Sequence, residues 1–160
     1  MKSVYFLVLS FCFCCCSTDK ETVLALNGGA ALSLGEANVI KISVTGDPNA
    51  YTFNVTVESP DTGCDQYTDW WEVIDLDGNL IHRRILAHSH VNEQPFTRSG
   101  TNIKLAKNTQ VYVRAHMNTS GYGAMVYKGS VENGFTVAEL DVEFAKGLEK
   151  KEPLPTGCAF

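Results

Sequence analysis

Hydrophobic and polar side chains alternate along several short stretches in the middle of the chain. Residues 51–58 place Tyr51, Phe53, Val55 and Val57 on one side and polar residues on the other, and residues 39–45 alternate in the same way. A period of two is typical of strands with one buried face. The residues between them, 46–49, read Gly-Asp-Pro-Asn. This part of the chain therefore predicts a first hairpin.

Two further hairpins follow from the same signals. The apolar stretches 70–75 and 79–86 flank Asp77-Gly78, a dipeptide that favours tight hairpin turns. Residues 110–116 and 124–131 flank a loop of small residues at 117–123. Residues 135–144 alternate as well and predict another strand, with a helix as the alternative, whereas residues 87–109 predict a long loop.

The pattern as a whole is that of an all-β protein. Roughly six to eight short strands separated by turn residues predict an antiparallel, immunoglobulin-like β-sandwich over residues 39–145. An up-and-down barrel is the alternative.

The beginning of the chain has a different composition. Lys2 precedes an apolar run over residues 4–13, which is too short to span a bilayer and ends among Cys12, Cys14, Cys15 and Cys16. The order of charge, apolar run and cysteine resembles a bacterial lipoprotein signal. We therefore predict a signal over residues 1–16 with Cys16 as the palmitate-bearing first residue. Cys14 and Cys15 remain alternatives because a small residue usually precedes the acylated cysteine.

The signal predicts a place in the cell. Residues 17–38 form a polar, Gly-containing tether, and no second apolar stretch approaches the length of a membrane-spanning helix, so we expect attachment to the membrane by lipid. The expected location is the cell envelope of a bacterium, as an outer-membrane lipoprotein, with display on the cell surface as one possibility. An envelope protein or a glycan is the expected partner.

Charge and cysteine content indicate which partner class to exclude and which covalent bond to expect. Without Lys2 the chain has 12 Lys and Arg against 18 Asp and Glu, a balance that disfavours nucleic acid as a partner. Four of the six cysteines lie in or beside the signal, which leaves Cys64 and Cys158. In an oxidising compartment such a pair predicts a disulfide, which would pin the tail 146–160, although two free thiols serving a metal are the alternative.

All four histidines fall between residues 82 and 116. His88 and His90 share one face of an extended segment, Glu93 follows closely, and His116 ends a predicted strand. Imidazole and carboxylate ligands suit zinc or copper, so His88, His90, Glu93 and His116 are candidate metal ligands. A hydrogen-bond network within a long loop is the alternative and the preferred interpretation.

Two other polar or aromatic sets are weaker candidates. Trp70, Trp71 and Tyr122 are candidates for a sugar-binding platform, although strand alternation places the two tryptophans on opposite faces, so that one belongs to the core. Asp61, Asp65 and Asp69 lie close together before Trp70. Oxygen-rich loops bind calcium, but a solvated turn is the preferred interpretation.

The run His-Ser-His-Val-Asn-Glu-Gln-Pro-Phe-Thr-Arg-Ser, residues 88–99, resembles a family of small, exported, uncharacterised bacterial proteins. The resemblance extends over residues 39–131 and implies no activity. Relatives in that family often carry histidine where this chain has Gln66 and Ser120, which implies that a histidine-rich metal site is depleted here.

No complete catalytic set is visible in the sequence. The preferred hypothesis is therefore a lipid-anchored binding or accessory module at the cell envelope rather than an enzyme. A copper- or zinc-binding metalloprotein and a carbohydrate-binding surface lipoprotein are the two alternatives.

Overall fold

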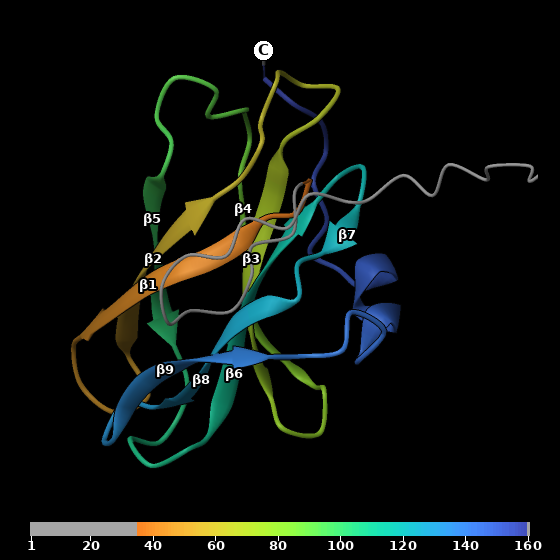
Figure 1. The fold of residues 1–160 in the computed structure, drawn as a ribbon. Coiled ribbons are helices and arrows are strands. Elements are labelled where there is room, and N and C mark those ends of the chain that lie inside the picture. Colours follow the sequence, from red (N-terminus) through yellow and green to blue (C-terminus); the bar gives the residue numbers. More distant parts are fainter. Residues whose placement is uncertain (1–34, 160) are drawn as a thin grey trace, which may run out of the picture.

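Nine strands form two sheets in the part of the chain that the computed structural model describes, residues 35–159 (Figure 1). The predicted signal, Cys16 and residues 17–34 of the predicted tether lie outside the described residues. The strands are Asn38–Thr45 (β1), Tyr51–Glu58 (β2), Thr68–Asp75 (β3), Leu80–Ile85 (β4), Phe96–Ile103 (β5), Val111–Met117 (β6), Gly121–Tyr122 (β7), Met125–Ser130 (β8) and Gly134–Glu139 (β9). A 3₁₀ helix, Lys146–Lys150 (η1), follows β9.

The two sheets are antiparallel throughout. One has the strand order β1-β2-β5, and the other has the order β4-β3-β6-β8-β9, with the short β7 paired to β6. The predicted all-β antiparallel sandwich is confirmed, and the arrangement is compatible with an immunoglobulin-like fold. The strands divide into two sheets and do not form the alternative barrel. None of the helices among residues 35–159 is long and apolar enough to cross a membrane.

The predicted hairpins are present, and their turns show why. β1 and β2 pair across the Gly46 turn, where Gly46 and Asn49 adopt positive φ angles of 98° and 67°. The turn between β3 and β4 places Gly78 at φ 84°. There the Asp75 carboxylate accepts backbone N–H bonds from Asp77 at 3.0 Å and Asn79 at 2.8 Å.

Three sequence-based boundaries were wrong. The predicted loop 87–109 contains β5, an edge strand whose polar residues hide the alternation. The strand expected over residues 135–144 ends at Glu139, because the backbone turns where Phe144 N–H bonds to Asp141 O at 2.8 Å. The folded part also begins inside the predicted tether, since Ala37 is fully buried in the core.

The core lies between the two sheets. The inward face of β2 is buried as predicted, and it meets Trp71 and Val73 of β3 and Val113 and Ala115 of β6. Gly100 of β5 lies where a Cβ atom would be 2.6 Å from the Trp71 ring. Glycine at this position therefore lets the two sheets approach around a fully buried tryptophan.

Both faces of the β3–β6 pair are buried, which positions the candidate site. Trp70, Glu72, Arg114 and His116 lie on the face opposite the core, yet each is at most 7% exposed. The segment after β9, including η1, covers this face (Figure 1). Leu148 of η1 is itself buried there.

Candidate functional site

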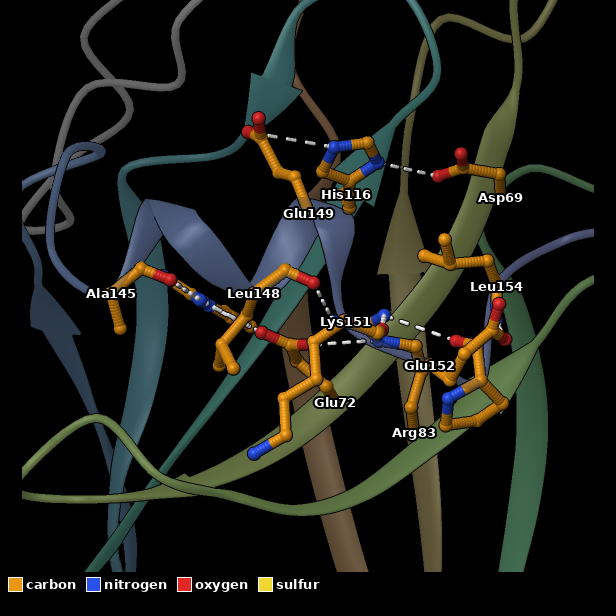
Figure 2. Close-up of polar contacts among 12 residues, drawn as sticks. Asp69, Glu72, Arg83, His116, Ala145, Leu148, Glu149, Lys151, Glu152 and Leu154 are labelled. Atoms are coloured by element: carbon orange, nitrogen blue, oxygen red, sulfur yellow. Dashed lines mark hydrogen bonds and ion pairs between the residues drawn. The ribbon is translucent and has the colours of Figure 1, made fainter.

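A buried carboxylate and imidazole form the centre of the candidate site. Asp69 on β3 and His116 on β6 come from adjacent strands, and the register places Trp70 opposite His116. His116 Nδ1 lies 2.7 Å from Asp69 Oδ1 (Figure 2). Burial raises the pKa of the Asp69 carboxyl, and the hydrogen bond with His116 opposes that rise. Because a carboxylate only accepts hydrogen bonds, this contact places a proton on Nδ1.

The indole of Trp70 supports the imidazole. The two rings are stacked, with centroids 3.7 Å apart and an interplanar angle of 8°. The Arg83 guanidinium carbon lies 4.4 Å from the Trp70 ring centroid. Arg83 is on β4 and His116 is on β6, the strands that flank β3, so the indole is held between a cation and an imidazole.

Glu149 of η1 approaches the other side of His116. Its Oε1 lies 3.7 Å from His116 Nε2, which is longer than a hydrogen bond (Figure 2). The Glu149 side chain is 25% exposed, whereas that of His116 is 9% exposed. The imidazole therefore links a buried carboxylate to one that reaches solvent.

An open hollow of about 350 Å³ lies beside this group. Polar side chains and the edges of larger ones line it: Trp70, His116, Met117, Asn118, Thr119, Ser120, Gly121, Lys146 and Glu149. The loop between β6 and β7 supplies one wall and η1 the other. The size and the few convergent polar groups suit a small ligand.

A second buried polar cluster holds η1 and the following residues on the sheet. Glu72 accepts hydrogen bonds from Arg83 and Arg114, with side chains that are at most 1% exposed. The guanidinium groups also donate to five backbone carbonyls, those of Phe144, Ala145, Leu148, Lys151 and Pro153. These bonds satisfy both cations and fix the position of Glu149 over His116.

Asp61 organises the loop that contains His88 and His90. Its carboxylate accepts bonds from Ser59 Oγ at 2.7 Å, from Thr68 N–H at 3.0 Å and from His90 N–H at 2.8 Å. Asp61 and Asp69 are 7% and 6% exposed, so the solvated-turn interpretation was wrong for both residues.

His90 is a packed core residue. Its ring stacks on Phe96 at 3.8 Å, and neither ring nitrogen has a hydrogen-bond partner among the described residues. Burial lowers the pKa of His90 to about 4. These contacts favour a structural role for His90 in the loop over a role as a metal ligand.

The predicted metal ligands do not form one site. The rings of His88 and His90 are 4.5 Å apart, but Glu93 pairs with Arg98 at 2.6 Å and His116 pairs with Asp69. Within residues 35–159, no group of three or more His, Cys, Asp or Glu side chains is placed to hold a metal ion. The prediction that His88, His90, Glu93 and His116 together hold a metal ion is therefore not met among these residues.

The predicted aromatic platform is also absent from the described surface. Trp70, Trp71 and Tyr122 are 3%, 0% and 3% exposed. Alternation does place Trp71 in the core and Trp70 on the opposite face, but the expectation that one tryptophan is exposed was wrong. The C-terminal segment covers the second face, and only Trp70 contributes to the lining of the hollow.

The disulfide between Cys64 and Cys158 is confirmed. It joins the loop before β3 to the end of the C-terminal segment, 94 residues away in the chain. The bridge and the arginine-bound carbonyls together hold this segment over the sheet.

Sequence reasoning named Asp69 only as part of a possible calcium-binding loop. It missed Lys146 and Glu149 as residues of the site, and it missed the Glu72 cluster. One signal was present: charged residues occur in the middle of apolar strands, as in Trp-Trp-Glu-Val at 70–73 and Val-Arg-Ala-His at 113–116. Such residues indicate a second buried face when an opposite charge is available on a neighbouring strand.

Comparison with known proteins gives one informative similarity. No protein-family model and no solved structure matches the chain, so membership of the family suggested by residues 88–99 stays a prediction. A protein of Halomicrobium mukohataei named "Putative lipoprotein" is 41% identical over 132 residues, which cover 76% of this chain and 65% of that protein. The chain is therefore similar over most of its length to a protein that bears a lipoprotein name, and it spans less than two thirds of that relative.

Proposed function

We propose that this protein is an exported, lipid-anchored β-sandwich that acts as a binding module at the cell envelope. The observation that carries the proposal is the apolar run that ends in Cys12, Cys14, Cys15 and Cys16. The lipoprotein name of the 41% identical relative supports it. The Cys64–Cys158 disulfide also supports it, because such bridges persist in oxidising compartments outside the cytosol.

The hollow beside His116 is the proposed ligand site of this module. It is the place where a buried side chain, His116, meets side chains that reach solvent, Glu149 and Lys146. The surrounding Arg83 and Arg114 contacts hold its walls without occupying it. A hollow in which several polar side chains surround a buried imidazole favours binding of a small ligand over a broad surface contact.

Anchoring is tested by replacing Cys14, Cys15 and Cys16 together with serine. The lipid would then have no attachment point, so we expect the protein to move from the membrane fraction to the soluble fraction. Cys12→Ser is the matched control, because Cys12 lies inside the apolar run, and it should leave the protein in the membrane fraction. Membrane retention of the triple variant equal to that of the control would overturn the anchoring proposal.

The position in the envelope is tested separately. Palmitate labelling of the membrane fraction tests the acyl chain, and outer-membrane placement predicts co-fractionation with outer-membrane markers. Protease treatment of intact cells then distinguishes surface display from a site facing the interior of the envelope. Digestion in intact cells is expected for surface display, whereas digestion only after cell disruption would contradict it.

A further inference from the structure

The hollow presents two hydrogen-bond acceptors to the same space. Asp69 accepts a hydrogen bond from His116 Nδ1–H, so Nε2 is an acceptor whenever the ring is neutral. Glu149 Oε1 lies 3.7 Å from Nε2, and a carboxylate oxygen is also an acceptor. Neither atom accepts a hydrogen bond from another described residue, and their separation is longer than a hydrogen bond. A group with at least two N–H hydrogens would satisfy both acceptors.

The lining also contains a donor that lacks an acceptor. Trp70 lines the hollow and is 3% exposed, and its Nε1 is buried with no hydrogen-bond partner among residues 35–159. A buried donor without a partner is costly, and native structures normally satisfy it with protein, water or ligand. Because this nitrogen is closed to solvent, a ligand oxygen in the hollow would supply the missing acceptor once the edge of the indole shifts towards it.

Charge around the hollow favours a cation. Asp69 and Glu149 flank His116, whereas the Lys146 ammonium is already paired with Glu143 at 2.6 Å. An anion placed against His116 would face two carboxylates. Thr119 and Ser120 also line the hollow, and their hydroxyl groups can either donate a hydrogen bond to a ligand or accept one from it.

We infer that the hollow binds a small ligand that carries a primary ammonium group beside an oxygen, an amino alcohol. The ammonium hydrogens bond to His116 Nε2 and Glu149 Oε1, and the ligand oxygen accepts from Trp70 Nε1. This inference rests on the proposed function, since it names the ligand class of the same site.

Ethanolamine and choline provide a matched pair of probes. Both carry a hydroxyl group and a positive charge, but the choline nitrogen has no N–H. Calorimetric titration of the purified protein at pH 8 and low ionic strength should give a dissociation constant for ethanolamine of roughly millimolar order, as expected for so small a ligand. Choline should bind at least about tenfold more weakly. Equal affinity for the two, or no binding of ethanolamine, would overturn the inference.

Glu149→Gln tests the proposed contact without threatening the fold. Glu149 is partly exposed and its side chain makes no hydrogen bond within the described residues, so the variant should unfold at the same temperature as the wild type. Its affinity for ethanolamine should fall about tenfold. Glu139→Gln removes the same charge from an exposed position of β9 outside the hollow and should leave affinity unchanged. Equal affinities for the two variants would contradict the assignment.

The source of the amino group is tested with vesicles. Retention on vesicles containing phosphatidylethanolamine, but not on phosphatidylcholine vesicles, would support a lipid headgroup as the ligand. Binding of free ethanolamine without vesicle retention would support a free amino alcohol. The serine variant without Cys14, Cys15 and Cys16 is used here, so that a lipid anchor does not contribute. If the protein does not bind ethanolamine, this inference is overturned but the anchoring proposal is not, because anchoring is tested separately by cell fractionation.

Discussion

Arg83 donates two hydrogen bonds to one oxygen of Glu72, from Nε at 2.8 Å and from Nη2 at 2.6 Å, in a fully buried ion pair. Arg114 donates to the other oxygen at 2.9 Å. Two cations against one carboxylate leave an excess of positive charge, which the carbonyls of the C-terminal segment offset. The sheet and the segment that covers it therefore depend on each other.

Arg83→Met should strongly destabilise the protein. The change leaves Glu72 with Arg114 alone and removes the donor for the carbonyls of Leu148, Lys151 and Pro153. Breaking one partner of a buried pair typically costs about 3–5 kcal/mol, which urea denaturation would measure. The neighbouring Arg84 is exposed and bonds to the carbonyls of Ser99 and Ile85. Arg84→Met should change the free energy of unfolding by less than about 1 kcal/mol, and a similar loss in both variants would contradict this interpretation.

Reduction of the Cys64–Cys158 disulfide should lower the melting temperature. The bridge closes a loop of 94 residues, and the chain-entropy treatment predicts a contribution of about 4.7 kcal/mol for a loop of this length. Differential scanning calorimetry with and without a reducing agent measures the change. Reduction should also speed proteolytic cleavage after β9, because the end of the C-terminal segment is released. Equal melting temperatures in the two conditions would show that the arginine contacts alone hold it.

His90 should make the protein less stable as the pH falls. Its pKa is about 4 in the folded protein against 6.5 as the ordinary value, because burial disfavours the charged ring. The unfolded chain therefore takes up a proton first, and stability present above pH 6.5 is lost progressively as the pH falls towards 4. The loss attributable to His90 is about 3 kcal/mol.

His90→Gln checks this dependence. Glutamine does not titrate, and the ring nitrogens that it replaces have no hydrogen-bond partner among the described residues. The variant should lose stacking against Phe96 at every pH, yet its free energy of unfolding should change less between pH 6.5 and pH 4 than that of the wild type. Parallel curves for the two proteins, measured by urea denaturation, would show that another group causes the acid sensitivity.

Gly100→Ala should destabilise the contact between the sheets. The added Cβ would lie 2.6 Å from both the Trp71 ring and His82 Nε2, and Trp71 is fully buried. Overpacking of this kind costs about 1–3 kcal/mol. Gly147→Ala is the matched control, since no atom lies within 4 Å of its Cβ position. Urea denaturation should separate the two variants, and equal stabilities would exclude overpacking at Gly100.

The first two hairpins and the disulfide were predictable because their signals are local or unambiguous. Tyr51, Phe53, Val55 and Val57 alternate with polar residues, and the same four side chains are buried. The turns contain glycines that adopt positive φ angles. Once the signal is set aside, Cys64 and Cys158 are the two cysteines left to pair.

β5 and the end of β9 were not predictable from alternation. Phe96–Ile103 contains Thr, Arg, Ser, Gly and Asn, because an edge strand buries few of its side chains, here chiefly Phe96, Gly100 and Ile103. Its pairing with β2 depends on residues 39 to 52 positions earlier in the chain. A local pattern contains no information about such a partner.

By itself, the sequence determined the antiparallel strand pattern and the disulfide, since periodicity and cysteine number do not depend on distant contacts. Only the tertiary structure decided the site. His88, His90 and His116 all fall within 29 positions of the sequence, but the β3–β6 register pairs His116 with Asp69, and the packing of η1 places Glu149 3.7 Å from its other ring nitrogen. Alternation shows that Trp70 and His116 share a face, but it does not show that a segment 30 residues later covers that face. That contact forms because buried Arg83 and Arg114 require acceptors, and the carbonyls of the C-terminal segment supply them.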